Sequence, residues 1–323
     1  MDILREWIEE ALNFLDYPGV VGVGVGMKEV GGRQTDRMCL TVMVQKKLPA
    51  GEIPRKHLIP EQVRSIATDV LEVGKLRAHV VAEEGSPAHP VGDVYLSRLR
   101  PARPGSSIGH FREPTGTFGA VVRDRETGRL LILSNNHVLA NSSNGHDGRA
   151  RPGDPILQPG PEDGGTPKDV LARLSRFVPL FLDKANDLDC AVAEPLKEDL
   201  VDPEIIGLGP VAGLATPTIN MTVLKSGRGS GVTRGKVLAV NATVRVEYSV
   251  GLLKLQHQVV CSRMSQSGDS GSLLVDANNR AIGVVFSGSR RLTVSSPIKP
   301  VLDALNVDLV VAEPGRAPIN RQR

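Results

Sequence analysis

From Thr117 onward the sequence consists of short apolar runs, and turn-forming residues separate most of them. Many short runs in series, punctuated in this way, predict an antiparallel barrel or a sandwich. Residues 298–306 (IKPVLDALN) predict one short closing helix. The runs are FGAVV, LLILSN, DCAVA, MTVLK, KVLAV, LKLQHQVV, SLLVD, AIGVVF and RLTVSS.

The first 80 or so residues have a different pattern, which predicts a small α/β lobe. Residues 2–15 carry apolar side chains at helical spacing. Between 21 and 27 valine or methionine alternates with glycine, which predicts a strand with one bare face, and 38–44 and 66–73 predict two more strands. A bare glycine face allows another element to approach closely. We expect that element to be the N-terminal helix.

Charge and cysteine content exclude several classes of protein. The formal net charge of +3 comes from scattered residues, so we expect no nucleic-acid partner. No apolar run approaches the roughly 20 residues that span a bilayer. The N-terminus lacks the pattern of a signal peptide, and the three widely separated cysteines form no readable disulfide framework. We therefore expect a cytoplasmic protein without a membrane partner.

Two glycine-rich stretches resemble nucleotide loops, and neither fits. GVGVG is not GxGxxG, and no helical pattern follows it. GRGSGVTRGK has the wrong spacing for a P-loop, and Val237 stands where a magnesium-binding Ser or Thr belongs. No histidine lies in a metal-binding spacing. We predict no cofactor and no metal.

Three polar motifs lie at the ends of predicted strands, in the chain order His, Asp, Ser. His137 follows an apolar strand in LLILSNNHVLA. In KANDLDCAVAEPL, Asp189 directly precedes a small apolar strand, as a buried orienting carboxylate should. Asp187 is the near rival, and Asp183 lies further out. Acyl transfer by a serine needs such a base and such a carboxylate.

The nucleophile candidate is Ser270, in MSQSGDSGSLLVDANN. Flanking glycines permit the sharp turn that exposes a serine Oγ, and the N–H groups of Gly268 and Ser270 could converge on an oxyanion. Taken alone, Gly-Asp-Ser-Gly is equally consistent with a hairpin turn. An α/β-hydrolase elbow is excluded, because Ser272 breaks GxSxG and the histidine does not come last.

These three motifs together resemble those of the chymotrypsin-like, or trypsin-like, serine peptidases. The stretches GTFGAVV…SNNHVLA, GDPILQPGP, LKSGRGSGVTRGKVLAV and SGDSGSLLV look similar to a bacterial group related to the plant Narrow Leaf serine protease. That plant family also has a GDSGS loop, so Ser272 is not anomalous. The resemblance extends to the N-terminal lobe and covers about residues 18–310.

The resemblance implies a mainly β fold, with two antiparallel β-barrels of chymotrypsin type and a small N-terminal α/β lobe. It implies an endopeptidase in which His137 is the general base, Asp189 orients it and Ser270 attacks. We divide the chain as follows: lobe 1–85, Pro/Gly-rich linker or wrapping arm 86–116, first barrel 117–213, second barrel 214–312 and loose tail 313–323.

The resemblance also implies substrate-binding positions. Met264, six residues before Ser270, would floor the S1 pocket and favour a small or medium apolar P1 residue over Lys or Arg. Phe286, Ser287 and Gly288 would lie along the substrate backbone. Asp269 needs a partner other than a new N-terminus, and a loop arginine is one candidate.

Two questions stay open at this level. The lobe could gate activity, recruit substrate or mediate assembly into a homo-oligomer, or it could merely bury one barrel face. The whole chain could also be a catalytically silent peptidase-fold scaffold or peptide-binding module, although an intact His, Asp and Ser set argues against that.

Overall fold

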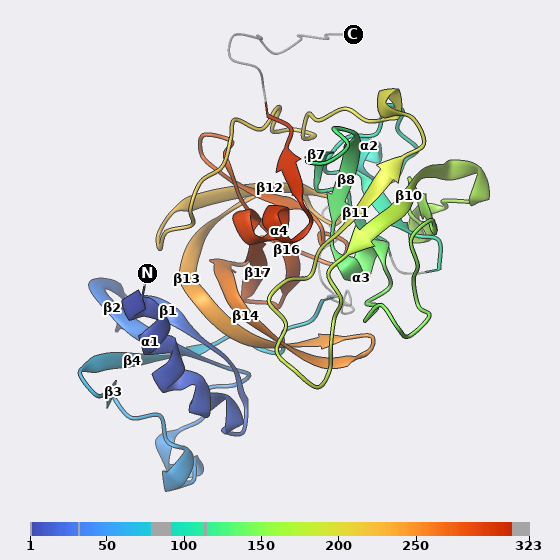
Figure 1. Cartoon of the computed structure of the whole chain (residues 1–323). Helices are drawn as coiled ribbons and strands as arrows, with labels where there is room; N and C mark the ends of the chain where they lie inside the picture. The colour runs from blue at the N-terminus through green and yellow to red at the C-terminus, as the bar shows by residue number, and fades with distance from the viewer. Residues whose placement is uncertain (1, 32, 79–91, 113–114, 312–323) are drawn as a thin grey trace.

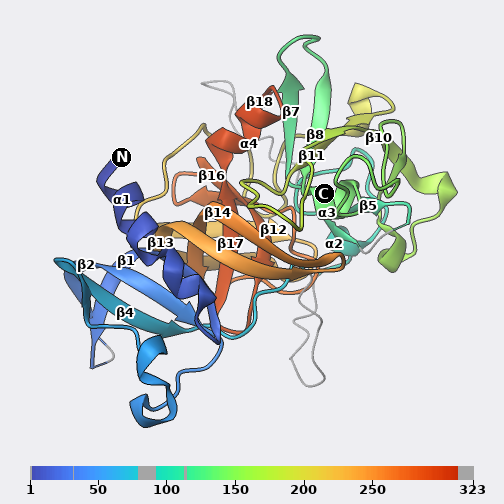
Figure 2. The same cartoon turned by 60° about the horizontal axis from the view of Figure 1, so that its bottom comes forward.

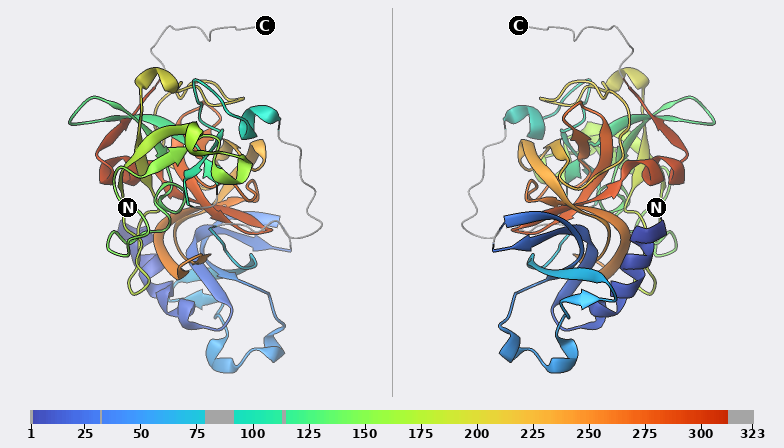
Figure 3. Two further views of the ribbon diagram at one scale, coloured as in Figure 1. Left: turned by 90° about the vertical axis from the view of Figure 1, so that its right-hand side faces the viewer. Right: turned by 90° about the vertical axis from the view of Figure 1, so that its left-hand side faces the viewer.

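A computed structural model of the chain describes residues 2–31, 33–78, 92–112 and 115–311. The structure is mainly β, with two curled sheets, which confirms the predicted two-barrel fold class (Figure 1). The second barrel lies between the first barrel and the N-terminal lobe (Figure 3).

The first sheet has the strand order β18-β7-β8-β11-β10-β9-β5-β6, and neighbouring strands in it run antiparallel. Apolar side chains from these strands fill its interior, among them Val121, Ile132 and Ile156. Its strands are β5 (Ser107–His110), β6 (Gly116–Thr117), β7 (Ala120–Asp124), β8 (Leu130–Ser134), β9 (Pro155–Leu157), β10 (Val170–Phe177), β11 (Ala191–Pro195) and β18 (Val307–Leu309).

The second sheet has the order β12-β15-β16-β17-β14-β13-β1-β2-β4-β3. Because β12 also pairs with β13, the strands from β12 to β13 close into a ring. These barrel strands are β12 (Thr222–Gly227), β13 (Gly231–Tyr248), β14 (Gly251–Ser262), β15 (Leu273–Asp276), β16 (Ala281–Gly288) and β17 (Leu292–Pro297). The predicted closing helix is α4 (Ile298–Ala304), and two single-turn helices, α2 (Asp93–Leu96) and α3 (Asn136–Leu139), belong to connections.

The two barrels share one apolar core. Leu133 and Val192 of the first sheet lie in the same buried cluster as Leu273 and Val284 of the second, and α4 adds Val301. Burying this much aliphatic surface between the sheets fixes one barrel against the other. Loops at this seam therefore have a defined geometry.

The N-terminal lobe extends the sheet of the second barrel. Strand β1 pairs with β13, and β2 with β4 in parallel. Helix α1 and the 3₁₀ turn Leu12–Asp16 pack on one face of these strands. The lobe comprises α1 (Asp2–Ala11), β1 (Val20–Val30), β2 (Arg33–Val44), β3 (Gln62–Val63) and β4 (Ile66–Glu72).

The expectation that the glycine face of β1 meets the helix is wrong. Val23 and Val25 face the helix cluster, so the helix packs on the valine face. A side chain at Gly24 would meet Ala242 of β13 at 3.1 Å, and one at Gly26 would meet Leu238 O at 2.9 Å. The glycines serve the close approach of β1 to the second barrel.

The structure differs from the predicted division of the chain at both ends of the first barrel. Strand β5, inside the segment assigned to a linker, pairs with β9 of the first sheet, and Ile108 is fully buried there. Strand β18, assigned to the second barrel, pairs with β7 of the first. Both segments belong to the first sheet because each contributes a fully buried apolar residue there, Ile108 from β5 and Val307 from β18. The predicted tail, 313–323, and the start of the arm, 86–91, lie outside the described residues.

Three further features concern the cysteines, the lengths of the helices and the grouping of possible metal ligands. Cys39, Cys190 and Cys261 are free and buried. No helix within the described ranges is long and apolar enough to cross a membrane. The part of the chain that the structure describes contains no group of three or more His, Cys, Asp or Glu that could hold a metal ion.

Substitution of Gly26 by Ala should weaken the junction between lobe and barrel. The new methyl group would lie 2.6 Å from Thr41 Oγ1 and 2.9 Å from the Leu238 carbonyl oxygen, so the backbone must shift. We expect the free energy of unfolding to fall by about 1–3 kcal/mol in urea denaturation. Gly51→Ala is the control, because nothing lies within 4 Å of its added methyl group. Equal stability of the two variants would contradict the close approach.

Candidate active site

His137 lies at the seam of the barrels, just after strand β8, in the single turn α3. Its ring is fully buried, and Nδ1 is hydrogen-bonded to Asp189 Oδ2. The His137 backbone N–H also donates to Asp189 Oδ1, at 3.2 Å. One carboxylate thus fixes both the ring and the backbone of the histidine. Because Nδ1 is engaged with Asp189, Nε2 is the ring nitrogen that can exchange a proton with another group.

Asp189 precedes β11 and is completely buried. Its backbone oxygen accepts a hydrogen bond from Asn135 Nδ2 at 2.7 Å, which links the two motifs. The rivals lie elsewhere: Asp183 is exposed, and the Asp187 side chain is 69% exposed, 4.0 Å from His257. The structure therefore brings Asp189, and neither rival, to the histidine.

Tyr248, at the end of β13, is a residue that the sequence motifs did not indicate. Its hydroxyl donates to Asp189 Oδ2 at 2.9 Å, and its ring meets that of His137 edge-on, 5.6 Å between centroids. Burial and the neighbouring Asp189 charge hold the pKa of Tyr248 well above its ordinary value, so the hydroxyl keeps its proton. A second-barrel side chain thus orients the carboxylate of the first barrel. The only sequence signal is a tyrosine at a strand end in a chain with few aromatics.

Ser270 lies on the loop between β14 and β15 and is 6% exposed. Its Oγ donates to the carbonyl oxygen of Ala78 at 2.8 Å, with the Phe286 carbonyl oxygen as a weaker acceptor at 3.4 Å. A side chain at Gly116 would meet both Val138, next to the histidine, and the Ser270 carbonyl oxygen, at 2.5 and 2.8 Å. The serine loop and the histidine turn therefore lie on either side of one glycine.

Glycine conformation sets the shape of the serine loop. Gly268 has φ +89° and Gly271 φ +97°, values that side chains rarely adopt. Among the described residues, neither the Gly268 nor the Ser270 N–H has a backbone acceptor, so both donors predicted for the oxyanion are unused there. Ser272 Oγ donates to the Asp269 carbonyl oxygen at 2.6 Å. Ser272 therefore stabilises the turn.

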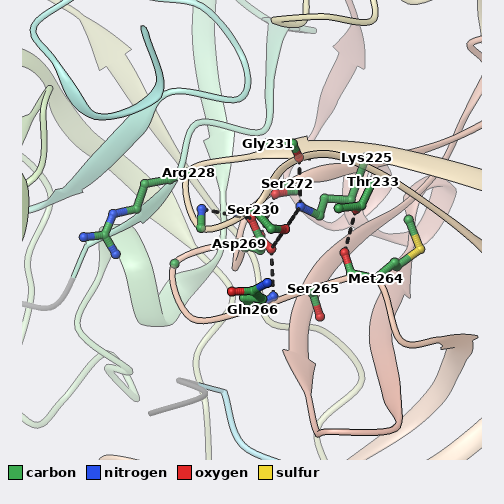
Figure 4. A network of polar contacts seen from close by, with 12 residues as sticks. Lys225, Arg228, Ser230, Gly231, Thr233, Met264, Ser265, Gln266, Asp269 and Ser272 are labelled. Carbon is green, nitrogen blue, oxygen red and sulfur yellow. Dashed lines mark hydrogen bonds and ion pairs between the residues drawn. The ribbon is translucent and has the colours of Figure 1, made fainter. Parts of the chain in front are cut away.

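A buried ion pair anchors the serine loop from beneath. Lys225 Nζ, from β12, lies 2.9 Å from Asp269 Oδ2, and both side chains are fully buried (Figure 4). Burial lowers the pKa of Lys225, and the Asp269 charge opposes that shift. The charged partner of Asp269 is thus a strand lysine and not the expected loop arginine, and the Arg228 side chain binds Asp163 instead.

Backbone and hydroxyl donors complete the anchoring of Asp269. Its Oδ1 accepts from the N–H groups of Gly229 and Ser230 at 3.0 and 3.1 Å, and its Oδ2 accepts from Gln266 N–H at 2.8 Å (Figure 4). Ser230 Oγ donates to Asp269 Oδ2 at 2.5 Å and accepts from Lys225 Nζ at 2.6 Å. These donors offset the cost of burying the Asp269 carboxylate away from water.

The first barrel holds the same loop from the opposite side. Thr117 N–H donates to the Ser270 carbonyl oxygen, and Thr117 Oγ1 donates to the Gly268 carbonyl oxygen, both at 2.7 Å. Arg228 N–H in turn donates to Thr117 Oγ1 at 3.0 Å. The Arg228 side chain makes two 2.7 Å bonds to Asp163, in the connection between β9 and β10 of the first barrel. Contacts from both barrels therefore determine the position of Ser270.

The residues expected to bind substrate lie in two environments. Met264 is 4% exposed and packs in a buried cluster with Val237, Leu274 and Ile282. Phe286, Ser287 and Gly288 form the end of β16, and Phe286 is fully buried. Besides its pairing with β17, Gly288 forms an isolated antiparallel bridge to Arg77. The substrate-binding role of all four stays a prediction.

Comparisons with solved structures find likenesses to serine proteases at low sequence identity. Protease A of Thermobifida fusca has a TM-score of 0.48 and 17% identity, over 65% of this chain and 98% of that chain. A glutamic-acid-specific serine protease gives 0.47 and 19%, over 64% and 100%. Nocardiopsis protease (NAPase) gives 0.47 and 19%, over 64% and 97%. No family model matches the chain, and a search of curated proteins finds no match.

Replacing Lys225 by Met should destabilise the protein strongly. The variant keeps the length of the side chain but leaves the Asp269 charge buried without a counter-charge. We expect the free energy of unfolding to fall by about 3–5 kcal/mol in urea denaturation. Lys299→Met is the matched control, because Lys299 pairs with Asp303 at the surface, where the pair contributes little. Equal losses in the two variants would show that the buried pair does not anchor the loop.

Proposed function

We propose that the chain is a serine endopeptidase that cleaves protein or peptide bonds by a Ser-His-Asp triad through an acyl-enzyme. The observation that carries this proposal is the buried Asp189–His137 hydrogen bond beside a glycine-framed serine whose hydroxyl already contacts a peptide carbonyl. A buried carboxylate fixes the imidazole tautomer, as general-base catalysis by histidine requires.

In the proposed reaction, Ser270 Oγ attacks the carbonyl carbon of the scissile bond while its proton passes to His137 Nε2. Asp189 stabilises the resulting imidazolium, and the N–H groups of Gly268 and Ser270 donate to the oxyanion. The C–N bond then breaks, and His137 gives its proton to the leaving amine. Water, deprotonated by the same imidazole, hydrolyses the ester and restores Ser270.

Several finer parts of the proposal come from sequence resemblance. They are a trypsin-like mechanism without trypsin-like P1 specificity, and kinship with the bacterial group similar to the plant Narrow Leaf serine protease. From the scattered cysteines and the N-terminal sequence we also propose a cytoplasmic location. Met264 as an apolar floor supports a small or medium apolar P1 residue. We also propose that the partners are protein or peptide substrates and, through the lobe, a second copy of the chain, rather than nucleic acid or a membrane.

Ser270→Ala should abolish turnover, because the attacking hydroxyl is gone. We expect a loss of about 10⁶-fold in kcat, and for Asp189→Asn a loss of about 10⁴-fold, the magnitudes typical of serine peptidases that use this triad. A fluorophosphonate probe should label the wild type and not Ser270→Ala. Ser65→Ala, an exposed serine in the lobe, is the control and should label like the wild type.

The labelling experiment also separates the enzyme from the silent scaffold. Labelling that survives in Ser270→Ala would place the nucleophile elsewhere. Absence of labelling in the wild type, under every pH and additive screened, would favour the peptide-binding module. Mass spectrometry of peptides retained by Ser270→Ala then identifies the bound class in either case.

Tyr248→Phe tests the positioning role of the tyrosine hydroxyl. The variant keeps the ring against His137 but removes a 2.9 Å hydrogen bond to Asp189. We expect kcat to fall roughly 10-fold with KM unchanged. Without this hydrogen bond, the negative charge of Asp189 interacts more strongly with the imidazolium. The acid limb of the pH–activity profile should therefore move to higher pH.

The control for Tyr248→Phe is Tyr17→Phe, in the N-terminal lobe. Loss of stability without a change in the pH profile would mean that the hydroxyl only packs, and would remove Tyr248 from the catalytic arrangement.

A further inference from the structure

The chain that leaves β4 runs along the end of β16 in the second barrel (Figure 2). The N–H of Arg77 donates to the Gly288 carbonyl oxygen, and the N–H of Gly288 donates to the Arg77 carbonyl oxygen, both at 3.1 Å. Ser289 Oγ also donates to the Val73 carbonyl oxygen at 2.5 Å. This reciprocal pairing is that of an antiparallel strand, although these residues are far apart in sequence.

The other edge of the same segment pairs with the end of β13. The N–H of Glu247 donates to the Leu76 carbonyl oxygen at 2.9 Å, and the N–H of Ala78 donates to the Glu247 carbonyl oxygen at 3.0 Å. Residues 76–78 therefore insert between Glu247 and Gly288 and hydrogen-bond to both. We call these three residues the inserted strand.

The inserted strand ends at the candidate nucleophile. The Ala78 carbonyl oxygen accepts the 2.8 Å hydrogen bond from Ser270 Oγ. The hydroxyl that should attack a peptide carbonyl is thus engaged with a peptide carbonyl of its own chain. Leu76 and Ala78 are 1% and 2% exposed and belong to the cluster that contains Phe286.

The middle residue of the inserted strand points its side chain at a carboxylate. Arg77 Nε donates to Glu247 Oε2 at 3.1 Å, and Lys75 Nζ lies 3.5 Å from Glu247 Oε1. Burial alone would raise the pKa of Glu247, but the hydrogen bond from Arg77 and the two cationic charges hold it below its ordinary value. Glu247 is therefore a carboxylate matched to a basic residue.

We propose that the inserted strand occupies the peptide-substrate groove along the end of β16, and that the Glu247 carboxylate makes this groove select an extended peptide with a basic residue. This inference rests on the proposed peptidase function. Peptides bind to proteins as added strands when main-chain groups are presented at an edge, with alternate side chains giving specificity. Here the main-chain groups belong to Gly288 and Glu247, and the specificity group is the Glu247 carboxylate.

Occupation of the groove by the inserted strand is regulatory. Because the strand is tethered, it competes with free peptides for the groove at a high effective concentration. A short connection to β4 keeps the inserted strand near the groove, so a free peptide at lower concentration is excluded until the strand leaves. The chain is then self-inhibited, and its substrates resemble the strand that they replace: a basic residue followed by a small one, as in Arg77-Ala78.

Arg77→Pro tests the occupation directly. Proline removes both the N–H that donates to the Gly288 carbonyl oxygen and the side chain that pairs with Glu247, while Gly288 and Glu247 themselves are unchanged. We expect the rate of Ser270 labelling by a fluorophosphonate to rise about 5- to 10-fold. Arg77→Lys, which keeps both the N–H and the charge, and Arg64→Gln, which removes an exposed lobe ion pair, are the controls and should label like the wild type.

A charge exchange covers the case in which the proline variant does not fold. Arg77→Glu and Glu247→Arg should each raise the labelling rate about 2- to 5-fold, since the ion pair is half exposed. The double variant restores the pair and should return the rate toward that of the wild type. If the two substitutions raise the labelling rate additively in the double variant, and its circular dichroism is unchanged, the Arg77–Glu247 pair does not hold the inserted strand.

The outcomes separate this inference from the proposed function. Labelling of all variants at the wild-type rate would leave the peptidase standing and refute the inserted strand as an occupant of the groove. Labelling of none, the wild type included, would refute the peptidase and the inference resting on it. Slower labelling of a folded Arg77→Pro would show that the strand builds the site.

Substrate profiling of Arg77→Pro tests the specificity. A library of acyl-peptide fluorogenic amides should show preference for Arg or Lys at one position on the acyl side. Glu247→Gln in the same background should lose that preference, and Glu247→Arg should exchange it for Asp or Glu. An unchanged profile in both variants would refute Glu247 as a specificity residue.

Discussion

The buried Lys225–Asp269 pair is the interaction on which the geometry of the serine loop depends. Removing two charges from water costs several kcal/mol for each ion, so the pair is stable only with good geometry and additional donors. Here Ser230 and three backbone N–H groups supply them. Because the Asp269 side chain reaches into the barrel, the next residue, Ser270, is turned toward the seam. Since β12 carries Lys225 and also closes the ring with β13, barrel closure and loop order are coupled.

Strand β13 is the element that joins the parts of the molecule. It pairs with β12 and β14 in the barrel and with β1 of the lobe, so the lobe is an extension of the barrel sheet. Its last two residues contact two parts of the candidate site: Glu247 pairs with the inserted strand, and Tyr248 donates to Asp189. The glycines of β1 permit this arrangement because side chains there would meet Ala242 or the Leu238 carbonyl oxygen.

Sequence patterns predicted the elements because those depend on local spacing. The apolar runs after Thr117 became strands, and 298–306 contains the helix α4. Contacts between residues that are distant in the sequence were harder to predict. The contact of His137 with Asp189 follows from strand ends that meet. Lys225 lies in a stretch that carries the resemblance, but nothing in it points to Asp269, and Tyr248 lies in an ordinary strand sequence. The glycine face was misassigned to the helix for the same reason, since the alternation shows which face is bare but not which element covers it.

The alternation of side chains along β13 gives the site a property that no single motif contains. Successive residues of a strand point to opposite faces, so Glu247 and Tyr248 serve two different partners from one strand end. Glu247 holds the inserted strand through main-chain bonds and its carboxylate, and Tyr248 holds Asp189. A shift of this strand end would therefore move the contact with the inserted strand and the contact with Asp189 together. The lobe pairs with the same strand through β1.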